Sequence, residues 1–257
     1  MDSWHCLQQL EPRLLLDADS VGLIGISEAS VIDITLTAIY IDKEGTAERV
    51  TSYPTHRIAV WGHPDRGGQY GPIGNGYVEI VGNEEAFAAL KADGSIISWG
   101  NGGFGGEDYY DGSLAPTDSG YTQIFSNYGA FAALKADGSI TAWGGYAGGS
   151  GAPTGSGYTQ IFSNGNAFAA LKADGSIAAW GEGDSGGSGA PAGSGYTQIF
   201  SNGNAFAALK DDGSITAWGR DDSGGSGAPT DSGYTQIVSN DNAFSALKDD
   251  GGIAAWG

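Results

Sequence analysis

The chain has 257 residues, including 46 glycines, yet 40% of its residues are apolar and 11% aromatic, which is enough for a hydrophobic core. Its formal net charge of −19 repels phosphate backbones and anionic lipids, so we expect neither nucleic acid nor a membrane surface as a partner. The single cysteine, Cys6, excludes an internal disulfide, and no apolar run reaches the roughly 18 residues of a membrane span.

Residues 1–30 are expected to be a leader outside the main fold. Met1 to His5 lack the basic stretch of a secretory signal peptide. Leu10–Leu16, followed by Asp17-Ala18-Asp19, resembles the LEPR-XLL segment at the N-terminus of very large bacterial secreted proteins. The resemblance implies an extracellular or cell-surface location, reached without a recognisable signal peptide, and implies no activity. A short amphipathic leader without a role is the alternative.

The same leader contains an incomplete calcium-loop pattern. Asp17, Asp19 and Glu28 fall at three of the ligand positions of an EF-hand loop, in which carboxylates surround Ca²⁺. Val21 stands where that loop needs an oxygen ligand. Calcium binding here is therefore one hypothesis beside a purely structural leader.

Residues 31–62 are expected to form a divergent first blade. Three strands fit this region, over Ile32–Ile41, Ala47–Tyr53 and Arg57–Trp61, with a turn at residues 42–45. The region lacks the signature that marks the units after it.

Residues 63–257 are built from five tandem repeats. Tryptophan-glycine pairs recur with spacings of 38, 44, 37, 38 and 38 residues, at Trp61, Trp99, Trp143, Trp180, Trp218 and Trp256. A phenylalanine series repeats with the same phase. Such a period is the mark of a repeat architecture.

Each unit predicts three strands. In one of them these are Tyr158–Ser163, Ala167–Lys172 and Ser176–Trp180, with a tight Asp174-Gly175 hairpin between the last two. The central strand is apolar on both faces, so both faces must be covered. We expect each tryptophan to pack between adjacent units. Radially stacked propeller blades satisfy these demands, with a parallel β-solenoid as the alternative.

The pattern GY-QI-S-AFAALK-DGSI-AWG, with its glycine-rich loop, resembles the regulator-of-chromosome-condensation repeat over roughly residues 57–257. Its short period is similar to that of the propeller-type β-lactamase inhibitor protein. The resemblance implies an all-β propeller with three or four strands per blade and roughly six blades, five clear and one divergent. It says little about function.

The last repeat ends at Gly257 without an atypical terminal unit. We therefore expect the propeller to be incomplete and the chain to be part of a longer protein; closure by the N-terminal strands is the alternative. The expected oligomeric state is a monomer.

Two motifs in the loops mimic catalytic signatures. Gly183–Gly187 reads GDSGG, but a serine nucleophile needs an oriented histidine, and His5, His56 and His63 all lie before the clear repeats. Two loops also fit G-x-G-x-x-G, but no helix follows them to receive a pyrophosphate. We expect no enzyme activity, no catalytic residues and no bound cofactor, calcium excepted.

Acidic and aromatic side chains in the loops between blades are the remaining candidates. Carboxylates that could recruit Ca²⁺, or simply form a solvated rim, are Glu107, Asp108, Asp111, Glu182, Asp184, Asp221 and Asp222. Aromatic residues that could anchor a partner are Phe104, Tyr109, Tyr110 and Tyr146. The longest spacing places Tyr109 and Tyr110 on the one extended loop.

These features favour a non-catalytic extracellular repeat module, a structural, adhesive or protein-binding part of a larger bacterial surface or secreted protein. Its partner would be a protein or a glycan. The alternative is a specific protein inhibitor or regulator that binds through the loop ring. A propeller glycosidase or lyase would need acids that converge on one pocket, and near-identical repeats distribute them instead.

Overall fold

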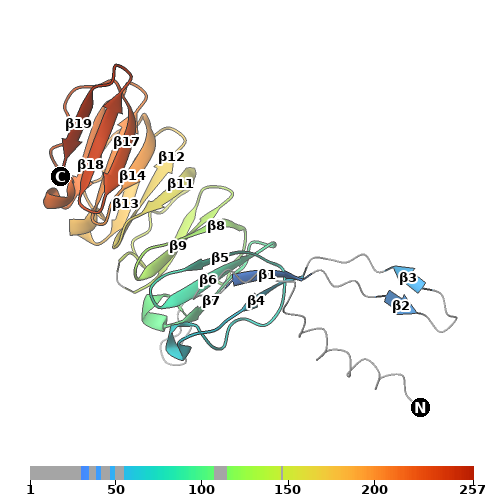
Figure 1. Cartoon of the computed structure of the whole chain (residues 1–257). Helices are drawn as coiled ribbons and strands as arrows, with labels where there is room; N and C mark the ends of the chain where they lie inside the picture. Colours follow the sequence, from blue (N-terminus) through green and yellow to red (C-terminus); the bar gives the residue numbers. More distant parts are fainter. Residues whose placement is uncertain (1–29, 35–38, 42–46, 50–54, 107–114, 146) are drawn as a thin grey trace, which may run out of the picture.

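The computed structural model describes residues 30–34, 39–41, 47–49, 55–106, 115–145 and 147–257 (Figure 1). Five antiparallel sheets of three strands each dominate it. Their strands are β5 (Tyr77–Gly82), β6 (Ala86–Lys91), β7 (Ile96–Gly100); β8 (Tyr121–Ser126), β9 (Ala130–Lys135), β10 (Ile140–Gly144); β11 (Tyr158–Ser163), β12 (Ala167–Lys172), β13 (Ile177–Gly181); β14 (Tyr196–Ser201), β15 (Ala205–Lys210), β16 (Ile215–Gly219); β17 (Tyr234–Asn240), β18 (Ala243–Lys248) and β19 (Ile253–Trp256).

The expected three strands per unit are confirmed, with β13 displaced by one residue from its predicted bounds. The hairpin between β12 and β13 forms because Asp174 closes it. Its carboxylate Oδ1 accepts hydrogen bonds from the amide of Ser176 at 2.9 Å and from its hydroxyl at 2.7 Å. Gly175 adopts the left-handed backbone that this turn requires, with φ at 77°.

The five sheets stack face to face in a row, and tryptophan joins each sheet to the one before it. Trp180 stacks on Phe168 of its own sheet with ring centroids 5.2 Å apart. It also packs against Leu134 and Ile140 of the preceding sheet. Its indole N–H donates to the carbonyl of Gly148 at 3.1 Å. The expected position of tryptophan between units is confirmed.

Short 3₁₀ turns occupy four of the loops that precede or connect the sheets. They are η2 (Pro64–Arg66), η3 (Gly102–Phe104), η4 (Gly183–Ser185) and η5 (Asp221–Ser223), each followed by a left-handed glycine. None of the helices in the described part of the chain has the length and apolar character needed to cross a bilayer.

An asparagine ties each of the loops that carry η3, η4 and η5 to the preceding sheet. Asn164 Nδ2 donates to the carbonyl of Ser185 at 2.6 Å, and Asn202 makes the same bond to Ser223 at 2.6 Å. The tryptophan of the next sheet holds the same loop from the other side, since Trp218 donates to Gly186 at 3.1 Å. The loop is therefore clamped between two sheets.

The N-terminal strands differ from the three that the sequence predicts. Strand β1 (Ser30–Ile34) pairs with β4 (Thr55–Ala59), and β2 (Ile39–Ile41) pairs with β3 (Ala47–Arg49), in two separate two-stranded sheets. The predicted first strand is thus divided between β1 and β2, because β1 pairs with the far end of the region and not with its middle. The assignment of residues 31–62 as a divergent blade stays a prediction.

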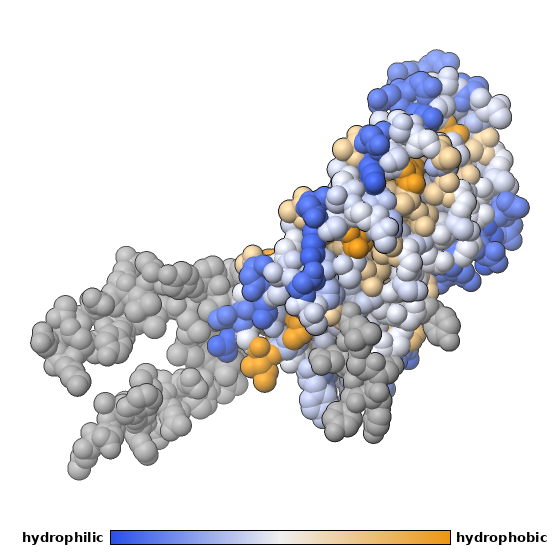
Figure 2. Space-filling view, turned by 180° about the vertical axis from the view of Figure 1, so that it is seen from behind, coloured by the Kyte–Doolittle hydropathy of each residue, from blue (hydrophilic) through white to orange (hydrophobic). Residues whose placement is uncertain are grey.

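The row is open in the described part of the chain and does not close into a ring (Figure 1). Ile58 and Val60 pack on the first sheet, around Tyr77 and Trp99. The outer face of the last sheet has no neighbour in the row, so Ile253 is 74% exposed there whereas Ile215, its equivalent one repeat earlier, is 8% exposed. Figure 2 shows apolar groups in a line along the row, with hydrophilic groups beside them.

Candidate functional site

The turns between the first and second strands align along one rim of the row. Their middle residues are the most variable positions of an otherwise regular turn, namely Glu84, Tyr128, Gly165, Gly203 and Asp241. Backbone amides join successive turns, from Tyr128 to Gly165 at 3.0 Å, from Gly165 to Gly203 at 3.2 Å and from Gly203 to Asp241 at 3.3 Å. This ladder fixes the spacing of the four turns from Tyr128 to Asp241.

Tyr128 is the aromatic member of this rim and is 55% exposed. Its ring lies against Gly165 in the next turn, where an added Cβ would lie only 2.8 Å from the ring carbon Cε2. Because Gly165 has no side chain, the ring can rest on its backbone. The neighbouring turn therefore supports one side of the ring and leaves part of it open to solvent.

Two inter-sheet loops depart from the regular repeat length, the extended loop after β7 and the shortened loop after β10. The loop after β10, at residues 145–149, is one residue shorter than its counterpart at residues 182–187, which accounts for the spacing of 37 residues between Trp143 and Trp180. Its described residues contain no 3₁₀ turn. Ala147 takes a left-handed conformation in it, with φ at 71°, which is uncommon for a residue other than glycine.

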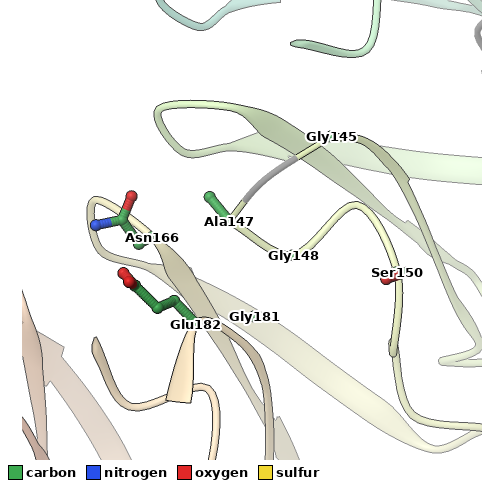
Figure 3. A pocket seen from close by; sticks show the side chains of 7 residues that line it. All are labelled: Gly145, Ala147, Gly148, Ser150, Asn166, Gly181 and Glu182. Atoms are coloured by element: carbon green, nitrogen blue, oxygen red, sulfur yellow. The ribbon is translucent and has the colours of Figure 1, made fainter. Parts of the chain in front are cut away.

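A cavity of about 410 Å³ lies beside the shortened loop. Figure 3 shows its lining, with Asn166 and Glu182 facing Ala147 across the opening. A second cavity of about 410 Å³ lies beside Tyr128 and Glu84. A third cavity, of about 200 Å³, shares lining residues with the other two. Ala147 and Asn166 also line the first cavity, and Glu84 and Tyr128 also line the second.

These shared lining residues make the three cavities neighbours along the rim. We call them together the rim groove, defined by Glu84, Phe104, Tyr128, Ala147, Asn166 and Glu182. The described residues that line it include two glutamates and no lysine, arginine or histidine. The groove therefore contains an aromatic ring and two carboxylates.

Most asparagines of the groove have structural partners. Asn83 Nδ2 donates to the carbonyl of Phe104 at 2.7 Å, and the side-chain amides of Asn127 and Asn164 donate to Ala147 and Ser185. The groups left to face a ligand are the Tyr128 ring, the Asn166 amide, the Glu84 carboxylate and backbone, together with the Glu182 carboxylate, which also accepts the Ser185 hydroxyl. Such a lining suits binding through stacking and charge.

The structure locates only part of the residues singled out in the sequence. Phe104 is half-buried, at the end of η3, and lines the groove. The other aromatic candidates, Tyr109, Tyr110 and Tyr146, lie outside the described residues, as do Asp17, Asp19 and Glu28.

The calcium candidates Glu107, Asp108 and Asp111 also lie outside the described residues. The described ones, Glu182, Asp184, Asp221 and Asp222, are exposed. Asp184 lies on η4, and Asp221 and Asp222 lie on η5. Within the described residues, no group of three or more histidine, cysteine, aspartate or glutamate side chains is placed to hold a metal ion.

Ser185 of the GDSGG string is fully buried, and its hydroxyl donates to Glu182 at 2.9 Å. Its position is that of a structural serine.

Sequence reasoning missed Tyr128, Glu84 and Asn166. Two signals could have revealed them. Tyr128 is the one aromatic residue at a turn position that otherwise holds acids and glycines. The spacing of 37 residues marks the shortened loop that lines the groove.

No family model and no curated protein sequence matches the chain. Among solved structures, it is similar to the ectodomain of the Physcomitrella patens receptor kinase CR4, with a TM-score of 0.52 and 19% identity over 90% of this chain and 63% of that one. Yeast RCC1 (Prp20), solved bound to Kap60, has a TM-score of 0.46 and 19% sequence identity over 70% of this chain and 55% of that one. Human WBSCR16 has a TM-score of 0.48 and 16% sequence identity over 70% of this chain and 61% of that one.

The chain thus spans 55 to 63% of the lengths of these three proteins. At such identities the likeness concerns the fold alone. It confirms the expected all-β, propeller-type blades, here in an open row.

Proposed function

We propose that this chain is a non-catalytic module that binds a protein partner through the rim groove. The observation that carries the proposal is the coincidence of two departures from the repeat, the shortened loop and the exposed Tyr128, at one continuous groove. Exposed aromatic residues in a concave site are frequent anchors of protein interfaces. The other turns of the rim carry no aromatic residue.

The composition of the groove supports binding over chemistry. Its described lining offers no histidine to act as a base and no nucleophile beside one. The two glutamates belong to different sheets, Glu84 to the turn after β5 and Glu182 to the loop after β13. A catalytic carboxylate pair would have to converge on one reacting bond.

We further propose that the module works outside the cell, as part of a larger bacterial surface or secreted protein. The segment Leu10–Leu16, which resembles the LEPR-XLL leader, supports this location. The net charge of −19 supports it as well, because cations in saline surroundings screen an acidic surface.

The test is selection of ligands on the folded chain. A random peptide library displayed on phage and an array of immobilised glycans are each exposed to the wild type, to Tyr128→Ala and to the matched control Tyr70→Ala. Tyr70 is 90% exposed but does not line the groove.

We expect peptides to be enriched that bind the wild type and Tyr70→Ala equally and lose binding to Tyr128→Ala. Enriched peptides that ignore Tyr128→Ala, or ligands found only among the glycans, contradict a protein-binding groove.

A further inference from the structure

The chain repeatedly places a cation over a tyrosine ring. Each of its five clear repeats pairs a lysine with the tyrosine that opens its first strand, with the lysine Nζ 4.7 to 5.4 Å from the ring centroid. In the second and last repeats an aspartate binds the same lysine, Asp118 for Lys135 and Asp231 for Lys248. In these two repeats the cation contacts both a ring and a carboxylate.

The rim groove also contains a tyrosine ring and carboxylates, and its described lining includes no basic side chain. Tyr128 and Glu84 line two of its cavities together. Neither takes part in the cation-ring contacts or salt bridges found among the described residues, where the nearby Arg66 pairs with Glu85 instead, at 3.1 Å. Because no basic side chain of the described lining supplies a cation, a binding partner can supply it.

We propose that the rim groove recognises an arginine side chain of its partner, stacked on the Tyr128 ring and paired with Glu84. This inference rests on the proposed function and specifies the chemistry of the partner. A guanidinium group is planar, so it can stack on a ring while its edge binds a carboxylate through two N–H groups. The net charge of −19 attracts such a segment over a longer range.

Gly165 is a positioning residue for this contact. An alanine there would bring a Cβ to 2.8 Å from the Tyr128 ring and so displace it. Gly203 occupies the same place one turn later, where an added Cβ meets only the carbonyl of Asp241, at 3.2 Å. Gly165→Ala and Gly203→Ala are therefore matched variants. Both add one methyl group to a rim turn, but only Gly165→Ala disturbs the Tyr128 ring.

The experiment titrates the isotope-labelled chain with a short glycine-arginine peptide and follows backbone amide signals by NMR. The control peptide has citrulline at each arginine, which keeps the shape and removes the charge. We expect the arginine peptide to shift the signals of Tyr128, Gly165 and Glu84. The citrulline peptide should bind at least about fivefold more weakly, and added salt should weaken the arginine peptide.

Variants then locate the contact. Tyr128→Ala should weaken the arginine peptide about fivefold, whereas Tyr128→Phe, which keeps a ring, should stay within about twofold of the wild type. Glu84→Gln should weaken it and reduce its salt dependence. Gly165→Ala should weaken it more than Gly203→Ala does, with all variants retaining the wild-type circular dichroism.

Three outcomes overturn the inference. They are equal binding of the citrulline peptide, shifts that map to the acidic turn Asp221–Ser223 instead of the groove, and indifference to Tyr128→Ala. If the peptide library yields groove-dependent ligands without basic residues, the inference fails and the proposed function stands. If it yields no groove-dependent ligand, both fail.

Discussion

The asparagine that opens each rim turn serves two structural purposes with one side chain. In Asn164, Oδ1 accepts the amides of Asn166 at 3.0 Å and Ala167 at 2.8 Å, which closes the turn. Its Nδ2 donates to Ser185 and so holds the next loop. Because Asn164 is only 7% exposed, losing it would leave buried backbone groups without partners.

Replacement of this asparagine tests that dual role. We expect Asn164→Ala to lower the free energy of unfolding by about 2–3 kcal/mol, measured by urea denaturation. The control is Asn240→Ala in the last repeat, where the side chain is exposed and its Oδ1 accepts the amide of Asn242. A loss at Asn240 as large as that at Asn164 would contradict the role of the loop contact.

The aspartates of the hairpin turns link stability to pH. The pKa of Asp174 is lowered from its ordinary value, first by the hydroxyl and then by the amide of Ser176, which both donate to the carboxylate. The pKa values of Asp93, Asp137 and Asp212 are lowered by the equivalent serines. A carboxyl with a lowered pKa in the folded state binds fewer protons than in the unfolded chain, so its contribution is lost as pH falls below about 4.

A variant in which these four aspartates become asparagine isolates the effect. Asparagine keeps an oxygen acceptor in the turn but does not titrate in this range. We expect the melting temperature of the wild type to fall more steeply than that of the variant between about pH 5 and pH 2.5. Parallel profiles would show that other carboxyls control the acid response.

The third strand of each unit is the element that joins two sheets. Trp218 in β16 is 4% exposed, stacks on Phe206 at 5.3 Å and packs in one cluster with Leu171 of the preceding sheet. Trp61 occupies the equivalent position before the first clear repeat and is 42% exposed. Tryptophan at this position of the repeat is therefore buried between two stacked sheets at Trp218 and partly exposed at Trp61.

We expect Trp218→Leu to cost about 3–4 kcal/mol, from lost packing and the lost indole hydrogen bond. Trp61→Leu should cost less than about 1 kcal/mol. Denaturant unfolding followed by far-ultraviolet circular dichroism measures both without relying on tryptophan fluorescence. Similar costs at the two sites would mean that Trp61 is packed as the others are.

The strands were predictable because their signals are local. The Asp-Gly turn, the AFAALK strand and the Trp-Gly pair each specify geometry within a few residues, and near-identical copies reinforce the pattern. The N-terminal pairing of β1 with β4 joins residues about 25 apart and has no such local signal.

The groove was harder to predict because it depends on contacts between repeats. Tyr128 matters through its support by Gly165, one repeat later, and the cavity matters through the absence of one residue from a loop. Phe104 was the one aromatic candidate that the structure places there.

At the scale of the whole molecule, the row behaves as a one-dimensional array. Each interface buries the same side-chain types, tyrosine, isoleucine, phenylalanine, alanine and tryptophan of one sheet against leucine and alanine of the sheet before it. Stability in such an array is approximately a sum of repeat and neighbour terms.

Removal of one unit tests this additivity. Deletion of residues 196–233 joins Gly195 to Tyr234 and brings β17–β19 against β11–β13, with the same residue types in contact. We expect the shortened chain to fold and to unfold cooperatively in urea. The slope of its free energy of unfolding against urea concentration should be lower by about one fifth. Loss of cooperative unfolding would show that the interfaces are not interchangeable.

The shortened loop after β10 also suggests how such a scaffold acquires new ligands. The buried contacts of the neighbouring sheets are kept although the connection between Trp143 and Trp180 has lost one residue. A linker one residue shorter than its counterpart thus lines a cavity, while the buried core beside it contains the same residue types as the other interfaces. In an array of near-identical repeats, a change of length in one linker can alter the surface locally, while the contacts between the other repeats preserve the fold.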